Sequence, residues 1–193
     1  MSKRSRRVAL SIVGVTAFAL AGCREDQIDA QAFPDLQSCQ TAALEGGLFS
    51  PAECDAAFKE AEQLHIEAAP RYDSLAVCEE QHGPEACVPE AQAGNGGSGS
   101  IFMPLLAGYL IGNMLGGRSG MARAQPLYRT PDGRFSNATG GSTYSSNSGK
   151  AKLGASQFAR PAATVGKAPM TKATAASRGG FGKTGAARGT YGG

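Results

Sequence analysis

Residues 101–115 read IFMPLLAGYLIGNML, an uncharged and mostly apolar stretch. As a helix it would rise about 22 Å, which is short of the roughly 30 Å hydrocarbon core of a bilayer. Within it and just beyond it, Gly108, Gly112 and Gly116 recur at every fourth position. In a helix this spacing leaves a groove without side chains, against which another helix packs closely. We therefore predict one short apolar helix over residues 101–117, with these three glycines as its packing positions.

Two roles for this helix remain open. It either joins copies of the chain into a homo-oligomer at a membrane, or it packs onto the cysteine-bearing segment of its own chain. Apolar segments of about 10–14 residues are usually core or interfacial rather than spanning. The residues before it, 93–100, include a match to the dinucleotide-binding pattern G-x-G-x-x-G, but no strand precedes the match. We predict a flexible Gly/Ser linker there and no cofactor.

The segment before the linker, residues 34–92, carries signals for three helices. Asp35 is placed to cap a short first helix. Ser50 and Glu53 form a capping box around a proline, which starts a longer helix that ends before Pro70. A third helix follows over about 75–81. On the second helix the apolar residues fall on one stripe: Cys54, Phe58, Ala61, Leu64 and Ala68.

The N-terminal residues have the layout of a secretory signal peptide, with a basic start and an uncharged stretch over residues 8–20. Leu20-Ala21-Gly22-Cys23 resembles the lipobox of bacterial lipoproteins. The resemblance implies cleavage after residue 22 and a diacylglyceryl group on Cys23. Arg24 stands where an inner-membrane retention signal has aspartate, which favours the outer membrane over the inner one. Residues 23–33 would then be a lipidated tether to the periplasmic side of that membrane.

Four further cysteines follow the lipobox: Cys39, Cys54, Cys78 and Cys87. An even number in an exported chain indicates a disulfide framework, for which three pairings are possible. The run DLQSC at 35–39 is echoed by SLAVC at 74–78, and proline introduces the next cysteine in PAEC and PEAC. This echo favours pairing Cys39 with Cys54 and Cys78 with Cys87. The alternative is a zinc site formed by Cys78, His82 and Cys87, but an oxidising compartment opposes free thiolates, and we predict no metal.

Charge divides the chain in two. Residues 24–92 carry three basic and fifteen acidic side chains, whereas residues 93–193 carry twelve basic ones and a single acid, Asp132. Such an asymmetry indicates different partners for the two parts. Residues 118–193 are rich in Gly, Ser and Ala and lack periodic hydrophobicity, which predicts a long disordered tail.

The tail contains arginine–glycine–aromatic runs, which bind nucleic acid in some proteins. Export sets a nucleic-acid partner aside. The remaining alternatives are an anionic envelope polymer, a lipid surface, the acidic segment of the same chain, and a solvated tail without any dedicated partner.

In this order the segments resemble the YgiB-type family of uncharacterised bacterial envelope proteins. The resemblance is carried by Cys23, the four spaced cysteines, FMPLLAGYLIGNMLGG at 102–117 and SRGGFG at 177–182. It implies a location and a layout and transfers no catalytic residue, because the family has no assigned activity.

Together these patterns predict a mostly α protein with three parts: a small disulfide-stapled helical domain, one glycine-spaced helix and a disordered tail. His65 and His82 do not assemble with other residues into a recognisable catalytic set. The sequence therefore favours a non-enzymatic structural or interaction factor, anchored to a membrane through Cys23 and binding an envelope protein or polymer. The alternative is a small envelope enzyme or ligand-binding module that uses the acidic helices.

Overall fold

A computed structural model describes residues 26–93, 99–114 and 122–178. Its centre is a curled antiparallel sheet of six strands in the order β7-β6-β5-β4-β1-β8. The strands are β1 (Gln27–Phe33), β4 (Gly108–Asn113), β5 (Ala122–Arg129), β6 (Phe135–Ser136), β7 (Thr143–Tyr144) and β8 (Gly149–Gly154).

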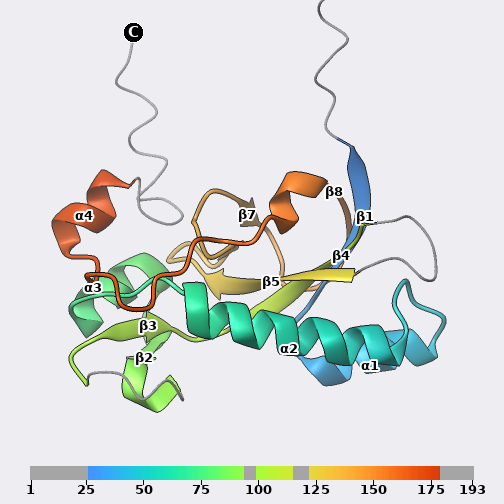
Figure 1. Cartoon of the computed structure of the whole chain (residues 1–193), viewed down its shortest axis with the longest axis horizontal. Coiled ribbons are helices and arrows are strands. Elements are labelled where there is room, and N and C mark those ends of the chain that lie inside the picture. Colours follow the sequence, from blue (N-terminus) through green and yellow to red (C-terminus); the bar gives the residue numbers. More distant parts are fainter. Residues whose placement is uncertain (1–25, 94–98, 115–121, 179–193) are drawn as a thin grey trace, which may run out of the picture.

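Helices cover one face of this sheet, and a smaller unit lies at one end (Figure 1). The covering helices are α1 (Leu36–Leu44) and α2 (Pro51–Ala68). The smaller unit contains α3 (Leu75–His82), a two-stranded sheet of β2 (Cys87–Pro89) and β3 (Phe102–Pro104), the 3-10 helix η1 (Glu90–Ala93) and the C-terminal helix α4 (Lys172–Ser177). A second 3-10 helix, η2 (Ala155–Phe158), follows β8.

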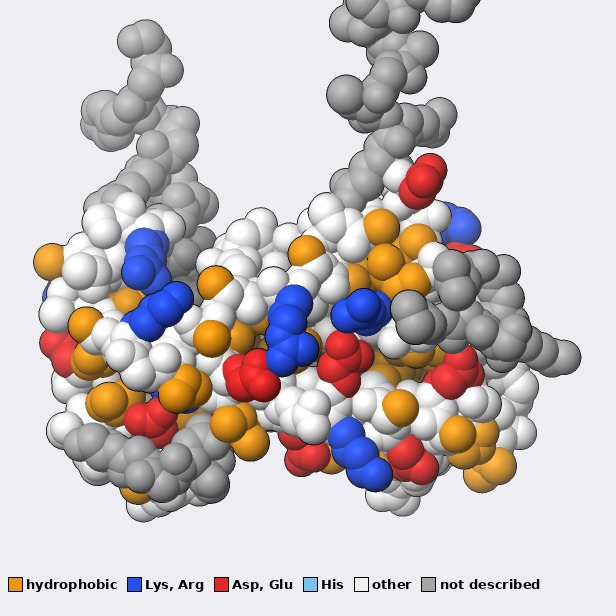
Figure 2. Space-filling model, in the orientation of Figure 1, with side chains coloured by type: hydrophobic (Ala, Val, Ile, Leu, Met, Phe, Trp, Pro, Cys, Tyr) orange, Lys and Arg blue, Asp and Glu red, His pale blue; other side chains and the backbone are white. Residues whose placement is uncertain are grey.

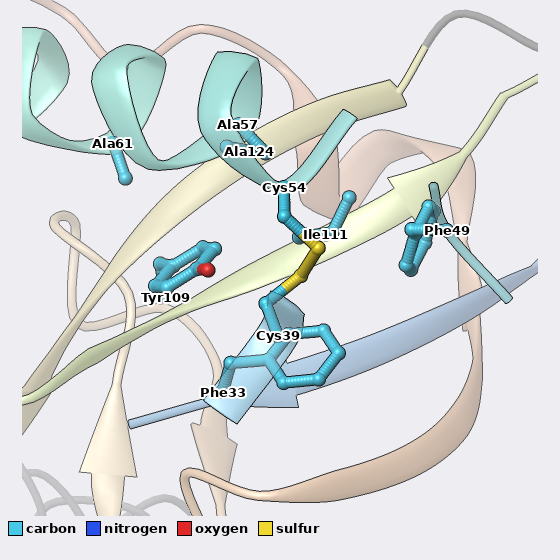
Figure 3. Close-up of a cluster of buried hydrophobic side chains, with 9 residues drawn as sticks. All are labelled: Phe33, Cys39, Phe49, Cys54, Ala57, Ala61, Tyr109, Ile111 and Ala124. Carbon is cyan, nitrogen blue, oxygen red and sulfur yellow. A yellow bond between two sulfur atoms is a disulfide. The ribbon is translucent and has the colours of Figure 1, made fainter. Parts of the chain in front are cut away.

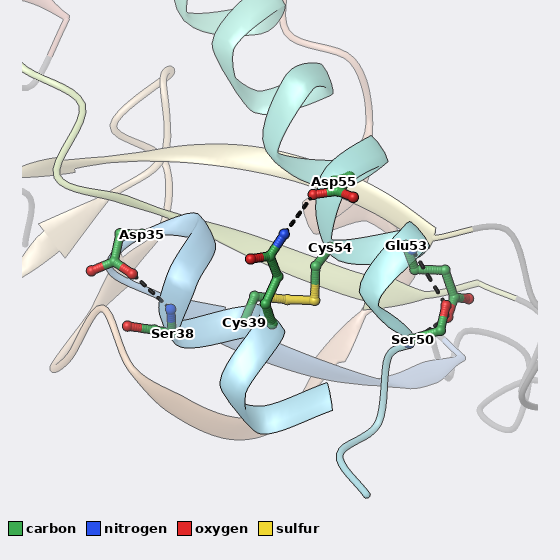
Figure 4. Close-up of a disulfide and its surroundings, with 8 residues drawn as sticks. Asp35, Ser38, Cys39, Ser50, Glu53, Cys54 and Asp55 are labelled. Carbon is green, nitrogen blue, oxygen red and sulfur yellow. Dashed lines mark hydrogen bonds between the residues drawn. A yellow bond between two sulfur atoms is a disulfide. The ribbon is translucent and has the colours of Figure 1, made fainter. Parts of the chain in front are cut away.

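The three helices predicted before the linker are confirmed. The Asp35 side chain accepts a hydrogen bond from the Ser38 backbone N–H at 2.7 Å and caps α1 (Figure 4). Ser50 and Glu53 form the reciprocal capping box of α2. Ser74 caps α3, which ends at Gly83 with a positive φ of 97°. Local side-chain chemistry at these helix ends therefore specifies their positions.

The prediction of a mostly α protein is wrong, and the apolar stretch is the main reason. Within residues 101–114, the structure has the two strands β3 and β4 rather than one helix. All six residues of β4 are buried, because β1 and β5 flank the strand and both faces of the sheet are covered. A strand buried on both faces has a continuous apolar sequence, which periodicity alone does not separate from a buried helix.

The glycine spacing has the same ambiguity. A spacing of four places residues on one side of a helix, but it also places them on one side of a strand, whose side chains alternate with a period of two. Gly108 and Gly112 do share the sheet face that packs against Phe158. They are therefore strand residues inside the sheet, and the helix through which they were predicted to pack does not form. Gly116 lies outside the described residues.

The disordered tail is also corrected. Residues 122–178 supply four of the six strands of the sheet, together with η2 and α4. β5 pairs with β4, and β8 pairs with β1, more than 100 residues earlier in the sequence. Pro126 is tolerated in β5 because β6 pairs only with Tyr128 and Arg129 and leaves the proline free of a ladder bond on that side. The short strands form because they pair with these distant strands, and amino-acid composition contains no information about such pairing.

Residues 27–33, which the sequence assigned to the tether, form β1, and this strand lies in the interior of the sheet between β4 and β8. The signal peptide, Cys23, most of the Gly/Ser linker and residues 179–193 lie outside the described residues. No helix in the described part of the chain has the length and hydropathy needed to cross a bilayer.

Two apolar clusters lie on opposite faces of the sheet. The cluster under the helices joins Phe33, Tyr109 and Ile111 of the strands to Cys54 and Ala61 of α2 (Figure 3). On the other face, Phe158 of η2 packs against Ala30, Leu110 and Leu127. The sheet is therefore sandwiched between the helices and the segment that follows β8.

The acidic and basic parts of the chain pair with each other within this fold. Four ion pairs join an acid from the first part to a base from the second: Asp29–Lys152, Glu60–Arg123, Glu67–Arg160 and Glu80–Lys172. Figure 2 shows red and blue side chains side by side over the region of α2. The charge division is thus partly satisfied inside one molecule, although exposed pairs of this kind each contribute at most about 1 kcal/mol.

Candidate functional site

The segment that connects η2 to α4, residues 159–171, crosses the C-terminal end of α2 (Figure 1). Its backbone is anchored at two points. The Thr164 N–H donates to the Glu67 carbonyl at 2.8 Å, and the Met170 N–H donates to the Arg71 carbonyl at 2.7 Å. The Asp73 N–H donates back to the Met170 carbonyl at 3.1 Å. We call residues 159–171 the strap.

Arg71 holds the strap and the helix end together. Its guanidinium is buried, and Nε donates to Glu90 Oε1 at 2.7 Å. Nη2 donates to the Ile66 carbonyl at 2.7 Å and Nη1 to the Ala69 carbonyl at 3.2 Å, which satisfies carbonyls that the end of α2 leaves open. Nη1 also donates to the Thr164 hydroxyl of the strap. A single cation therefore links α2, η1 and the strap.

A cleft of about 340 Å³ opens between the strap, α4 and the end of α2. Three of its lining side chains are cationic (Arg71, Lys167 and Arg178), and no acidic side chain from residues 26–93, 99–114 or 122–178 lines it. Glu90 neutralises Arg71, whereas Lys167 and Arg178 are exposed. The remaining lining residues are apolar apart from two threonines: Ala68, Pro70, Ala138, Thr139, Pro161, Ala162, Thr164, Ala168, Met170 and Ala175. The cleft is therefore apolar in its walls and positive in charge.

A row of histidine and tyrosine side chains lies in the interior, and neither histidine lines the cleft. Tyr72 Oη and His82 Nε2 are 2.8 Å apart, and His82 Nδ1 donates to the Arg129 carbonyl at 2.8 Å. Because a carbonyl only accepts, Nδ1 carries the proton and Nε2 accepts from the Tyr72 hydroxyl. His65 Nδ1 lies 3.1 Å from Tyr128 Oη.

Burial keeps these groups neutral. It lowers the pKa of His82 to about 4, and burial together with the charge of Arg71 lowers the pKa of His65 to about 4. Burial also raises the pKa of Tyr72 and of Tyr128. Neutral and hydrogen-bonded in this way, the row joins α2, α3 and β5 as part of the packing.

The structure joins Cys39 to Cys54 and Cys78 to Cys87, the pairing that the sequence echo favours. The first disulfide fastens α1 to α2 against the sheet (Figure 4). The second fastens α3 to β2 in the smaller unit. Neither lines the cleft. With Cys78 and Cys87 bonded to each other and His82 bonded to Tyr72, the residues considered for zinc are committed to other contacts.

Comparison with known proteins identifies the family. The model of a family described as "Protein of unknown function (DUF1190)" matches residues 27–192. The chain belongs to the DUF1190 family. A UPF0441 protein of Klebsiella pneumoniae (strain 342) is 35% identical over 190 residues, which cover 92% of this chain and 79% of the relative. A UPF0441 protein of Pectobacterium carotovorum is 32% identical over 196 residues, covering 94% and 82%.

The resemblance to the YgiB-type family is thereby confirmed. No solved structure matches the chain. The DUF1190 match begins at Gln27, the first residue of β1, and extends past α4. The family unit therefore contains the whole sheet, the strap and the cleft.

Sequence reasoning missed the residues that build the cleft in this DUF1190 chain. Arg71 had a usable signal, because it is one of three basic residues among the fifteen acids of residues 24–92 and follows directly after the proline that ends α2. Arg178 stood in the SRGGFG run at 177–182, which pointed to the family rather than to a cleft, and Lys167 had no signal, since it lies in a Gly/Ser/Ala-rich stretch. Only the crossing of the strap over α2 brings them to Arg71.

Proposed function

We propose that the chain is a lipoprotein of the bacterial envelope that acts as a non-enzymatic interaction factor, held by lipid on Cys23 to the periplasmic side of the outer membrane. The lipobox-like motif ending at Cys23 supports the anchor. Two disulfides support residence in an oxidising compartment.

The position at which β1 begins is the structural observation that best supports the proposal. Gln27 is the fourth residue after Cys23 and already belongs to the sheet. Four extended residues span at most about 14 Å. A lipid on Cys23 would therefore hold the folded unit directly at the head-group surface, rather than on a long flexible stalk. An interaction factor in this position reaches partners at or near the membrane surface, such as another envelope protein or an anionic polymer.

The enzymatic alternative has less support from the geometry. The two histidines, which are the usual general bases, are engaged with tyrosines and a backbone carbonyl in the interior. Two acidic residues of α2, Glu60 and Glu67, form ion pairs with basic residues from the second part of the chain.

Metabolic labelling with a radioactive or alkyne fatty acid tests the anchor. We expect the wild-type chain to be labelled and to fractionate with the outer membrane, and Cys23→Ser to lose both properties. Arg24→Asp serves as the matched control, since it keeps the lipidated cysteine: it should retain the label and move toward the inner membrane. Label that survives Cys23→Ser, or an unlabelled wild-type chain, would overturn the proposal.

A further inference from the structure

We propose that the cleft beneath the strap binds an organic phosphate, with the phosphate group at Lys167 and Arg178 and a small apolar body against the alanine, proline and methionine walls. This goes beyond the proposed anchoring, because it assigns a ligand site to the folded unit itself. The cleft volume of about 340 Å³ is within the range of small-molecule sites, roughly 300–1,000 Å³.

Charge is the first argument. Four bases from the second part of the chain are paired with acids of the first part, as Arg160 is with Glu67 and Lys172 with Glu80. At the cleft, Arg71 is neutralised by Glu90, and among the described residues the lining has no acid to offset Lys167 and Arg178. Two uncompensated positive charges match a phosphate monoester, which carries about −1.5 to −2 at neutral pH, better than a single carboxylate.

The nature of the two cations is the second argument. A guanidinium presents a planar fork to two phosphate oxygens, and an ammonium acts as a point charge beside them. Both side chains are exposed, so neither gives up a buried contact to meet a ligand. Arg178 also touches the wall, since its Nη1 lies 3.8 Å from Met170 Sδ. The cation and the apolar surface are therefore adjacent, as an amphipathic anion requires.

The hydroxyls of the cleft give the third argument, because they are already committed. Thr164 Oγ1 donates to the Ala69 carbonyl at 2.6 Å, and Thr139 Oγ1 donates to Asn137 Oδ1 at 3.0 Å. A sugar or another polyhydroxylated ligand would find few open partners on these walls. An apolar group gives up no hydrogen bond on these walls, and the burial of its surface favours binding.

Titration calorimetry on the full mature chain in a neutral detergent tests the site, with hexyl phosphate as the probe. We expect saturable one-to-one binding, and at least tenfold weaker binding of inorganic phosphate because it lacks the apolar body. Lys167→Ala/Arg178→Ala should weaken hexyl phosphate at least tenfold. Lys152→Ala/Arg123→Ala removes one lysine and one arginine outside the cleft and should leave the affinity within twofold.

A second pair of variants separates the cleft from general surface charge. Ala162 lines the cleft and Ala163 does not, although both are exposed neighbours on the strap. Ala162→Trp should block hexyl phosphate while Ala163→Trp does not, with both variants unfolding at the wild-type temperature. If dihexanoyl phosphatidic acid competes with hexyl phosphate, the natural ligand is a lipid head group. If it does not compete, the natural ligand is a soluble organic phosphate. No binding by the wild-type chain, or equal losses in either pair of variants, would overturn the proposal.

Discussion

The ring of Phe158 lies against the backbone of Gly112, so that a Cβ atom at position 112 would be 2.5 Å from Cζ of the ring. The two residues are in η2 and β4, and their contact closes the sheet face opposite the helices. The packing of this fold therefore requires glycine at position 112 of β4.

This contact predicts the outcome of substitutions at Gly112. Gly112→Leu should lower the free energy of unfolding by about 1–3 kcal/mol or more, because the added side chain must displace Phe158 from a packed face. Urea denaturation measures the change. A Cβ atom added at Gly99 would have no atom within 4 Å, so Gly99→Leu should be close to neutral. Wild-type stability in Gly112→Leu would show that β4 is not packed against η2.

Arg71 and Glu90 predict a strongly asymmetric mutational response. Arg71→Met leaves Glu90 buried without its partner and should cost about 3–5 kcal/mol in the free energy of unfolding. Arg71→Met/Glu90→Leu should cost less than the single change, because no charge is left stranded. Lys152→Ala, which removes an exposed pair with Asp29, is the control and should cost at most about 1 kcal/mol. Equal losses for the first and last variants in urea denaturation would contradict the buried link.

The buried His82 and the half-buried His65 predict a pH dependence of stability. The folded-state pKa of His65 and of His82 is lowered to about 4, against 6.5 for an ordinary histidine. Between these values the unfolded chain binds protons that the folded chain does not, so their stabilising effect is complete above about pH 6.5 and is lost as the pH falls toward 4. Each histidine should contribute a slope of about 1.4 kcal/mol per pH unit in that window.

Urea denaturation of wild type and His82→Gln at pH 7, 6 and 5 measures this slope. The variant should be less stable at pH 7, because glutamine does not reproduce both hydrogen bonds, and its stability should fall less between pH 7 and 5. His65→Gln should remove the other part of the slope. An identical slope in all three chains would mean that the histidines are not buried as described.

The two disulfides predict a defined peptide map. Non-reducing mass spectrometry of the native protein should find Cys39 linked to Cys54 and Cys78 linked to Cys87. Removing the first bridge as Cys39→Ser/Cys54→Ser opens a loop of 15 residues and should lower the free energy of unfolding by about 3 kcal/mol. Four free thiols, or crossed linkages, would refute the pairing.

Local signals in the sequence were sufficient for the three helices before the linker, whereas α4 was missed. Ser50 and Glu53 act over three residues, and Asp35 and Ser74 cap the helices that follow them directly. The disulfide pairing was also predictable, because the bonded cysteines are only 15 and 9 residues apart in the sequence. The candidate cleft was not predictable in this way, because Arg71 and Thr164 are 93 residues apart and meet only through the strap.

The sequence by itself therefore determined the three helices, the four-cysteine pattern and the family, since each rests on residues that are close together in the chain. Tertiary structure decided the rest. Residues 108–113 became a strand because β1 and β5 flank them, and the glycine spacing of four, equally valid for a helix, suited a sheet face that receives Phe158. Residues 122–178 of the predicted tail are ordered because β8 pairs with β1, β5 pairs with β4, and several of their basic side chains pair with acids from the first part of the chain.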